Sequence, residues 1–401
     1  MPLISKAATT ALICTLASCA WAQTPSSLSS ALLNRTALPT HTHSSSDIPP
    51  PIPCNGSDVG PLINQHLQTH RIATLGPGIC QTSQPISMPS NSTLQGSGMD
   101  TTTLMLAPNS NTNLIESENF SSLQATASFA LAPSGINVHN ITLNGNYLAK
   151  PWKHPFNTIL NSKGSCVAFI ASRYTLNARV DNCPDHMLYS ENSGKRPPFE
   201  PASIINIYGS VSGKECIVWR GPGDSYLQTA MIGLCAIAPM STAKKHPTTS
   251  ALYPDDLISG LLIDKSPPYD GTLEIGFAHI YGVFDGYAVL SKGNPRIKAS
   301  HLVAESSAGA LNLSSKTWGI ISLLDIHRTA ISHPNRLSTA IPPAPPALIC
   351  PPSLAVSALL YNNHPNPPTS KTLFDPKKTL CHIHTIQSPS GAIDHETFQP
   401  Q

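Results

Sequence analysis

The chain has 401 residues, enough for a large core or several domains, and its formal net charge is +2 with only 11% charged residues. No run of Lys and Arg occurs, so the charge pattern gives no support for a nucleic-acid partner or an anionic membrane surface. Proline, at 39 residues, is about twice as frequent as in an average protein, which argues against long helices and favours loops, turns and short strands.

Residues 1–22 are predicted to be a signal peptide. Lys6 supplies a positive charge, residues 7–20 are apolar but too short to span a bilayer, and Ala20-Trp21-Ala22 fits the small-x-small pattern before a cleavage site. A second interpretation stays open, because Leu16-Ala17-Ser18-Cys19 resembles the lipobox of bacterial lipoproteins. We expect a secreted or periplasmic protein without a transmembrane segment, and a lipoprotein anchored through Cys19 is the alternative.

Residues 23–53 are rich in Ser, Thr and Pro and are predicted to form a disordered arm. Residues 54–70 follow and predict a short amphipathic helix. Asp58 can cap its start, and its apolar side chains fall on one face: Val59, Leu62, Ile63 and Leu67.

Eight cysteines remain after the signal peptide, and they form four pairs of neighbours in the sequence. Pairing of neighbours would join Cys54 to Cys80, Cys166 to Cys183, Cys216 to Cys235, and Cys350 to Cys381. The spacing favours this pattern but does not fix it, because eight cysteines allow many pairings. A metal site is the alternative, although no Cys-x-x-Cys is present and exported chains favour disulfides.

From residue 71 onward the chain consists of short apolar segments separated by Gly, Pro, Asn and Ser. Between about 135 and 333 these segments recur with a period near 22 residues: His301 follows His279, and Leu311 follows Val289, at that interval. A fixed period of this length is typical of a solenoid, in which each turn buries its apolar side chains against the next. Three short strands per turn then describe an all-β, right-handed parallel β-helix, with the helix of residues 58–67 as its N-terminal cap.

Two segments near the start strengthen this interpretation. IATLGPGIC (72–80) and PISMPSNSTLQGSG (85–98) resemble the opening of many members of the pectin-lyase-like superfamily, where a capping helix precedes similar motifs. The resemblance covers residues 54–106, and the repeat period extends the predicted β-helix domain to 54–333. It implies little about activity, because the superfamily contains lyases, hydrolases, esterases, phage tailspikes and binding proteins. A β-sandwich is the alternative fold, but it does not explain the constant period.

The period is lost in residues 334–401, a Pro-rich tail that we expect to cover the C-terminal end of the solenoid. Two polar insertions, residues 190–201 and 240–256, interrupt the repeats earlier. They carry basic side chains that would suit an acidic polysaccharide in a groove, and ordinary solvated loops are the alternative: Lys195, Arg196, Lys244, Lys245 and His246.

Two catalytic schemes fit such a groove. A lyase needs a base and a cation that neutralises the substrate carboxylate. The resemblance to pectate lyases implies an Arg base and Ca²⁺ held by acidic residues. The candidate bases are Arg179, Arg220 and Arg296, and the candidate ligands are Asp181, Asp185, Asp264 and Asp285. Only Asp185 and Asp285 recur at the spacing of the repeats, so the sequence itself does not support calcium.

A glycosidase needs two carboxylates. The resemblance to polygalacturonases implies an Asp-Asp pair, a His and an Arg-Ile-Lys in this order, and the chain has candidates for each: Asp255, Asp256, His279, Arg296 and Lys298. The upstream Asn-Thr-Asp of that family is missing, and His279 lacks its flanking glycines. His279 and His301 are also expected to stack on neighbouring turns, as a metal or proton-transfer pair or as a hydrogen-bonded ladder.

The sequence therefore predicts an exported, carbohydrate-active β-helix that cleaves a polysaccharide by lyase or glycosidase chemistry. The alternative is a β-helix without catalysis that binds polysaccharide or serves as a cell-surface scaffold or adhesin. A compact set of acids and bases on one face of the solenoid would favour the enzyme, and a ladder of uncharged Asn and Ser would favour the scaffold. The sequence leaves open the sugar, the bond and the oligomeric state.

Overall fold

The structure is a computed structural model of the 401-residue chain. It describes residues 48–126, 132–151, 158–192, 203–237, 259–265, 271–283, 286–305, 307, 309–328, 347–363, 374–384, 386–387 and 393–394. The predicted signal peptide and most of the predicted arm lie outside these residues. No helix within them is long and apolar enough to cross a membrane.

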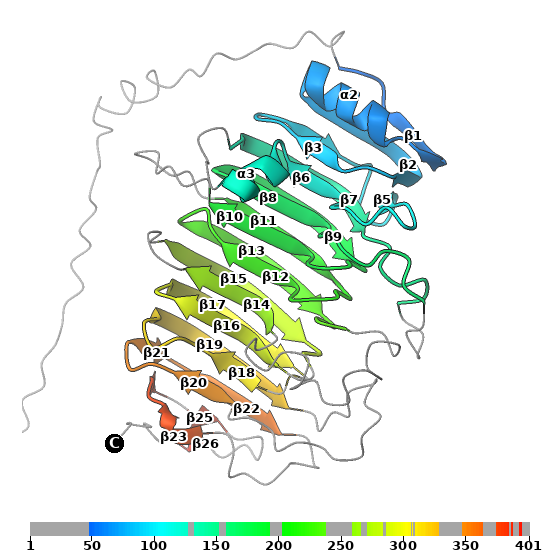
Figure 1. Cartoon of the computed structure of the whole chain (residues 1–401). Coiled ribbons are helices and arrows are strands. Elements are labelled where there is room, and N and C mark those ends of the chain that lie inside the picture. Colours follow the sequence, from blue (N-terminus) through cyan, green and yellow to red (C-terminus); the bar gives the residue numbers. More distant parts are fainter. Residues whose placement is uncertain are drawn as a thin grey trace, which may run out of the picture. The chain divides into compact units, whose positions relative to one another are not determined.

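The chain coils as a solenoid, and each turn adds strands to two parallel sheets that run along its length (Figure 1). Sheet A has 16 strands: β1 (Ile52–Asp58), β2 (Ile72–Thr82), β4 (Thr93–Gln95), β5 (Thr102–Leu106), β7 (Ser134–Asn144), β9 (Arg173–Asp181), β11 (Ile204–Ser210), β13 (Ser225–Gly233), β15 (Thr272–Tyr281), β17 (Arg296–Glu305), β19 (Trp318–Arg328), β21 (Leu354–Val356), β22 (Leu359–Asn363), β24 (His382–Ile383), β25 (Ile386–Gln387) and β26 (Ile393–Asp394).

Sheet B has 10 strands: β3 (Ile86–Met88), β6 (Ile115–Ser117), β8 (Val167–Ala171), β10 (Leu188–Asn192), β12 (Ile217–Arg220), β14 (Ser259–Lys265), β16 (Tyr287–Gly293), β18 (Gly309–Asn312), β20 (Leu348–Cys350) and β23 (Phe374–Thr379). The strand pairs are parallel, and the final pair, β25 with β26, is antiparallel. The prediction of a parallel β-helix is thus confirmed, and its right-handed coiling stays the expectation for parallel crossovers.

Each long strand of sheet A serves as two short strands joined at a bend. The first half of β2 pairs with β4 and its second half pairs with β5, so one turn contains one strand of sheet B and two halves in sheet A. In β7 the bend lies at Asn140, which has a positive φ of 58°. It adds one residue to the strand and so shifts the alternation of inward and outward side chains by one position. Val138 and Ile141, on either side of the bend, can therefore both point into the core and are fully buried.

The interior is a continuous column of Ile, Leu, Val and Ala side chains that runs along the solenoid. At its N-terminal end the predicted helix is present as α2 (Gly60–His70), and Ile63 and Leu67 are fully buried against the column. Asp58 accepts a hydrogen bond from the Gly60 amide (3.0 Å), which satisfies one donor of the first turn. Leu62, expected on the buried face, is 39% exposed.

The period near 22 residues holds at several steps of the stack. Val289 pairs with Leu311, and Arg296 pairs with Trp318. Between β15 and β17 the interval is longer, because residues 282–295 connect these strands whereas the shorter segment 306–317 connects β17 to β19. His279 therefore pairs with Val303, and His301 pairs with Phe277. The predicted stacking of the two histidines is wrong.

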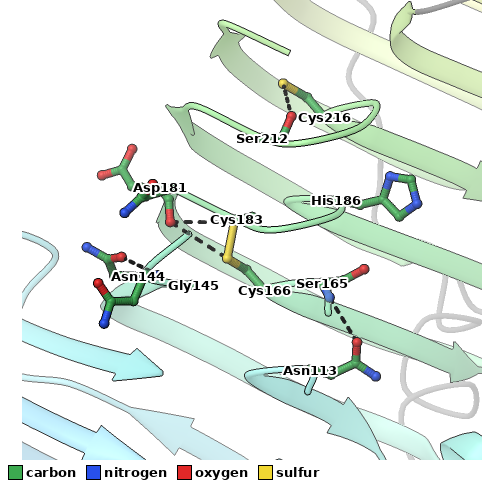
Figure 2. Close-up of a disulfide and its surroundings, with 12 residues drawn as sticks. Asn113, Asn144, Gly145, Ser165, Cys166, Asp181, Cys183, His186, Ser212 and Cys216 are labelled. Atoms are coloured by element: carbon green, nitrogen blue, oxygen red, sulfur yellow. Dashed lines mark hydrogen bonds between the residues drawn. A yellow bond between two sulfur atoms is a disulfide. The ribbon is translucent and has the colours of Figure 1, made fainter. Parts of the chain in front are cut away.

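All four predicted disulfides are present: Cys54–Cys80, Cys166–Cys183, Cys216–Cys235 and Cys350–Cys381. Cys166 directly precedes β8 and Cys183 follows β9, so this bond closes a single turn of the solenoid on itself (Figure 2). The bond between Cys216 and Cys235 encloses β12 and β13 in the same way. Such cystines fit an oxidising compartment.

Strands of the C-terminal region join both sheets beyond residue 333, where the sequence loses its period. β20 extends sheet B from β18, while β21 and β22 extend sheet A from β19. Their inward side chains are buried, with Leu348, Val356 and Leu359 fully so. The tail thus adds turns to the stack within residues 347–363.

Candidate functional site

The longer connections of the solenoid begin or end at strands of sheet B. From β7 to β19 the two halves of each sheet-A strand are continuous, so no connection emerges at the bend. In contrast, residues 145–166, 193–203 and 234–258 all link a strand of sheet B to its neighbour in sheet A. The long connections therefore begin and end at the edges of sheet B, and functional residues are often found where such connections join a rigid sheet.

The outer face of sheet B carries a row of alternating charges on four successive strands. Glu191 of β10 pairs with Arg220 of β12, and Asp264 of β14 pairs with Lys292 of β16. Arg220 and Asp264 join the two pairs, because Nε of Arg220 donates to Oδ2 of Asp264 at 3.1 Å. The preceding residues on β12 and β14, Trp219 and Ile263, point inward and are buried. The strands thus present acids and bases side by side, about 4.8 Å apart per turn.

Tyr189 lies beside this charged row, on the same strand as Glu191 and in the neighbouring row that continues with Val218. Its phenol donates a hydrogen bond to the Glu191 carboxylate and accepts one from Nη1 of Arg220 at 3.1 Å. Burial, together with the neighbouring carboxylate, raises the pKa of Tyr189 to about 12, so the phenol keeps its proton at neutral pH. Burial opposes the charge of Arg220, but its neighbours Tyr189, Asp264 and Glu191 raise its pKa overall.

His186 precedes β10 and brings a base close to Tyr189. Its ring centre is 6.1 Å from that of Tyr189, and its side chain is 14% exposed (its place beside the turn is visible in Figure 2). Nδ1 lies 2.9 Å from the carbonyl oxygen of Glu215. A carbonyl can only accept, so Nδ1 carries the proton and Nε2 of the neutral ring has the free lone pair.

The charge of the His186 ring depends on its surroundings. Burial lowers the pKa of His186, and Lys214 acts in the same direction, while the carboxylates of Glu215 and Asp185 partly oppose the shift. Lys214 is itself paired with Asp185 at 2.8 Å. The imidazole is therefore neutral at pH 7 and able to accept a proton.

The predicted glycosidase residues are not assembled on this face. His279, Arg296 and Lys298 lie on the outer face of sheet A, and Asp255 and Asp256 lie outside the described residues. Each of the three contacts a different partner: Nε2 of His279 lies 2.8 Å from Glu305, Nζ of Lys298 lies 2.6 Å from Glu274, and the Arg296 guanidinium lies 4.7 Å from the centre of the Trp318 ring.

His279 is also separated from Lys298 within the sheet. Lys298 pairs with Glu274, which is five residues from His279 along β15 and on the other side of the unpaired Gly276. The catalytic assignment of these five residues stays a prediction.

Among the predicted lyase residues, the structure brings Arg220 together with Asp264 on sheet B and Arg179 together with Asp181 on sheet A (2.5 Å). Asp185 lies in the turn before β10 and accepts from the Gly164 amide, and Asp285 is not among the described residues. Within the described ranges, no group of three or more His, Cys, Asp or Glu side chains is placed to hold a metal ion.

Sequence reasoning missed Tyr189, Glu191 and His186. A signal was present, because the sheet-B strands LYSEN, IVWR, LLIDK and AVLSKG each carry a charge just after an apolar stretch. Aligning these segments would have placed the charges in one row. The long insertions between them hid the alignment, since they break the regular period.

No protein-family model and no curated protein sequence matches the chain. Among solved structures, the chain is similar to the A-module of the mannuronan C-5 epimerase AlgE6 from Azotobacter vinelandii. The two are 12% identical, the match covers 77% of this chain and 83% of that one, and the TM-score is 0.31.

Proposed function

We propose that this protein is an exported enzyme that cleaves an acidic polysaccharide by β-elimination on the outer face of sheet B. The observation that carries the proposal is the position of Arg220, which contacts both the Tyr189 phenol and the Asp264 carboxylate on the outer face of sheet B. A compact set of acids and bases occupies this face, which favours an enzyme over a scaffold.

The three functional groups match the needs of elimination. Arg220 neutralises the carboxylate of a uronic acid, which acidifies the proton on the neighbouring carbon. Nε2 of His186 removes that proton, and its electron pair forms a carbon–carbon double bond while the glycosidic carbon–oxygen bond breaks. Tyr189 gives its proton to the leaving oxygen, and the proton on His186 then returns to the Tyr189 phenolate through water. No electrons are gained or lost by the protein.

The spacing of the cations supports an acidic chain as the substrate. Arg220 and Lys292 lie two strands apart in the same row, so roughly 10 Å separates their backbones. That interval is close to two sugar units, and carboxylates on alternate sugars could bind both cations. The basic side chains in residues 190–201 and 240–256 would strengthen the attraction for such a chain.

Hydrolysis is a second candidate, because the charged row also contains two carboxylates. Glu191 and Asp264 face outward two strands apart, roughly 10 Å by strand spacing. This is near the upper end of the separation of roughly 6.5–9.5 Å in inverting glycosidases, which place a water between an acid and a base. The predicted set of Asp255, Asp256, His279, Arg296 and Lys298 stays a separate hydrolase proposal, of which His279, Arg296 and Lys298 lie on sheet A.

A screen of the purified mature protein tests the proposal, using uronic-acid and neutral polysaccharides with and without calcium. Elimination produces unsaturated ends that absorb ultraviolet light together with new reducing ends, whereas hydrolysis produces reducing ends alone. The variant Tyr189→Phe removes only the phenol oxygen and is expected to slow elimination at least about 100-fold. Tyr208→Phe on the outer face of sheet A is the matched control and should cleave like the parent protein.

The outcomes separate the alternatives. Reducing ends without absorbance would exclude elimination, and Asp264→Asn compared with Asp256→Asn would then show which of the two candidate sets carries the hydrolase. Binding of a polymer without any cleavage would favour the scaffold or adhesin. Thermal unfolding of each variant checks that loss of activity does not reflect loss of the fold.

A further inference from the structure

We infer that the polysaccharide can leave the sheet-B face in one direction only, so that the enzyme removes short products from a chain end. This inference rests on the proposed function and concerns the same site. It follows from how the short helix α3 (Phe120–Thr126) is packed relative to the charged row.

The helix α3 covers the outer face of β8. Its side chains Phe120 and Leu123 pack on Ala168 and Ile170, and all four are nearly or fully buried, with exposures of 7%, 3%, 1% and 0%. Figure 1 shows α3 alongside β8, toward the N-terminal end of the stack. A polymer lying across the strands of sheet B cannot pass over β8 while this contact is formed.

The covered strand is the next one to the reactive residues. Ile170 of β8 pairs with Glu191, so a buried isoleucine stands where the charged row would continue. The ring of Phe120 also meets the ring of Tyr189 edge to face, with centres 6.0 Å apart. Only about one strand spacing, ~5 Å, separates β10 from the covered strand, which leaves room for about one or two sugars on this side.

In the opposite direction the row stays open. The side chain of Arg220 is 40% exposed and Lys292 is exposed, and just beyond the end of β18 the strand register continues the row at the partly exposed Ser314. In the neighbouring row of the same face, Val218, Leu262 and Leu290 are covered, with 3%, 6% and 4% exposure, so the open path is limited to the charged row. The long part of the substrate would therefore extend along the exposed Arg220 and Lys292, from β10 toward β18.

The connection that contains α3 is longer than the equivalent connection on the next turn of the solenoid. Residues 118–133 join β6 to β7, whereas the single residue Ser172 joins β8 to β9 on the next turn. The two connections meet, because the Ser172 amide donates to the carbonyl of Pro133 at 3.1 Å. A connection of one residue is therefore enough to pass from sheet B to sheet A, and α3 is not needed for the solenoid itself. Its effect is to cover the N-terminal end of the outer face of sheet B.

The experiment compares product sizes and viscosity for the full chain and for two variants. The parent protein is expected to release mostly one- and two-sugar products while the viscosity of the polymer falls slowly. In one variant a short linker replaces residues 119–132, and in the other Phe120→Ala and Leu123→Ala undock the helix while keeping its length. Both should release longer products from within the chain and lower the viscosity several-fold faster at equal numbers of bonds cleaved.

Gln124→Ala, an exposed position of α3, is the matched control and should leave the product pattern unchanged. Cleavage by the parent protein into long products of random size would overturn this inference while leaving the proposed function intact. Absence of any cleavage would overturn the proposed function itself. If the linker variant does not fold, the double substitution still decides between the two product patterns.

Discussion

Arg220 and Tyr189 lie on neighbouring strands of sheet B, and Nη1 of the guanidinium donates a hydrogen bond of 3.1 Å to the phenol oxygen. Nε of the same guanidinium binds Asp264, so one planar group fixes two neighbours at once. Lysine carries the same charge, but its ammonium lacks the planar, rigid set of donors that holds both contacts in a fixed geometry. This geometry makes the arginine a sensitive position for mutation.

Arg220→Lys is expected to lower kcat/KM on an acidic polysaccharide by about 100-fold, because the cation loses its fixed position relative to Tyr189. Initial rates at several substrate concentrations measure the effect. Arg173→Lys at the exposed start of β9 is the matched control and should keep the parent rate. Equal rates for Arg220→Lys and the parent protein would contradict a role of the guanidinium geometry.

The pH dependence of cleavage should report His186. The proposed base works only when neutral, so activity is lost as the pH falls through its pKa. Burial lowers that pKa, and the acidic limb of kcat/KM should therefore lie below the ordinary histidine value near 6.5. On the alkaline side, activity should persist well past neutrality, because Tyr189 keeps its proton up to a pKa of about 12.

The variant Glu215→Gln sharpens this test. The Glu215 carboxylate raises the pKa of His186, so its neutralisation should move the acidic limb to still lower pH, while the backbone carbonyl keeps its contact with Nδ1. A pH–rate profile of both proteins between about pH 4 and 9 measures the shift. An acidic limb that does not move would assign it to another group.

The bond between Cys216 and Cys235 should contribute measurably to stability. It closes a loop with a sequence separation of 19, and replacing both cysteines with alanine is expected to lower the free energy of unfolding by about 3 kcal/mol. Chemical denaturation without reductant measures this difference. Reduction of the other three bonds in the variant serves as a control, because it should lower stability further. An unchanged midpoint for the double variant would show that packing alone holds this turn.

Gly319 on β19 tolerates no side chain. Its φ is 136°, and a Cβ there would lie 1.9 Å from the backbone oxygen of Ile297, which cannot move without distorting β17. Gly319→Ala should therefore cost at least about 2 kcal/mol of stability. Gly56→Ala is the matched control. Its φ of 85° is also positive, but no atom lies within 4 Å of an added Cβ, so only the cost of the positive φ remains. Similar losses at both positions would rule out the clash.

The sequence was sufficient for the fold because the repeat and the cysteine spacing are local patterns. The period located turns such as Val289 above Leu311, and neighbour spacing gave all four disulfides. The register of the strands was harder to predict. One connecting segment is longer by two residues, so His279 pairs with Val303 instead of the expected His301. A shift by two residues keeps every side chain on the same face of the strand, so the pattern of apolar residues in the sequence does not reveal it.

The candidate site was less accessible from the sequence. Tyr189, Arg220 and Asp264 come from three turns, and the intervening connections differ greatly in length. Their proximity depends on strand register, which the sequence does not state directly. Family motifs pointed instead to Arg296 and Lys298, whose partners in the structure are a tryptophan ring and a glutamate on sheet A.

The disulfides that close single turns have a consequence for proteolysis. Cys166–Cys183 and Cys216–Cys235 each link two residues of the same turn. None of the four disulfides bridges residues 184–215 or residues 236–349. A protease that cuts within 193–202 or 238–258 would thus produce separate polypeptides even without reductant. These fragments would stay together only through the hydrogen bonds and apolar contacts of the stacked turns, so a nicked protein could keep its shape in native buffer and separate in detergent.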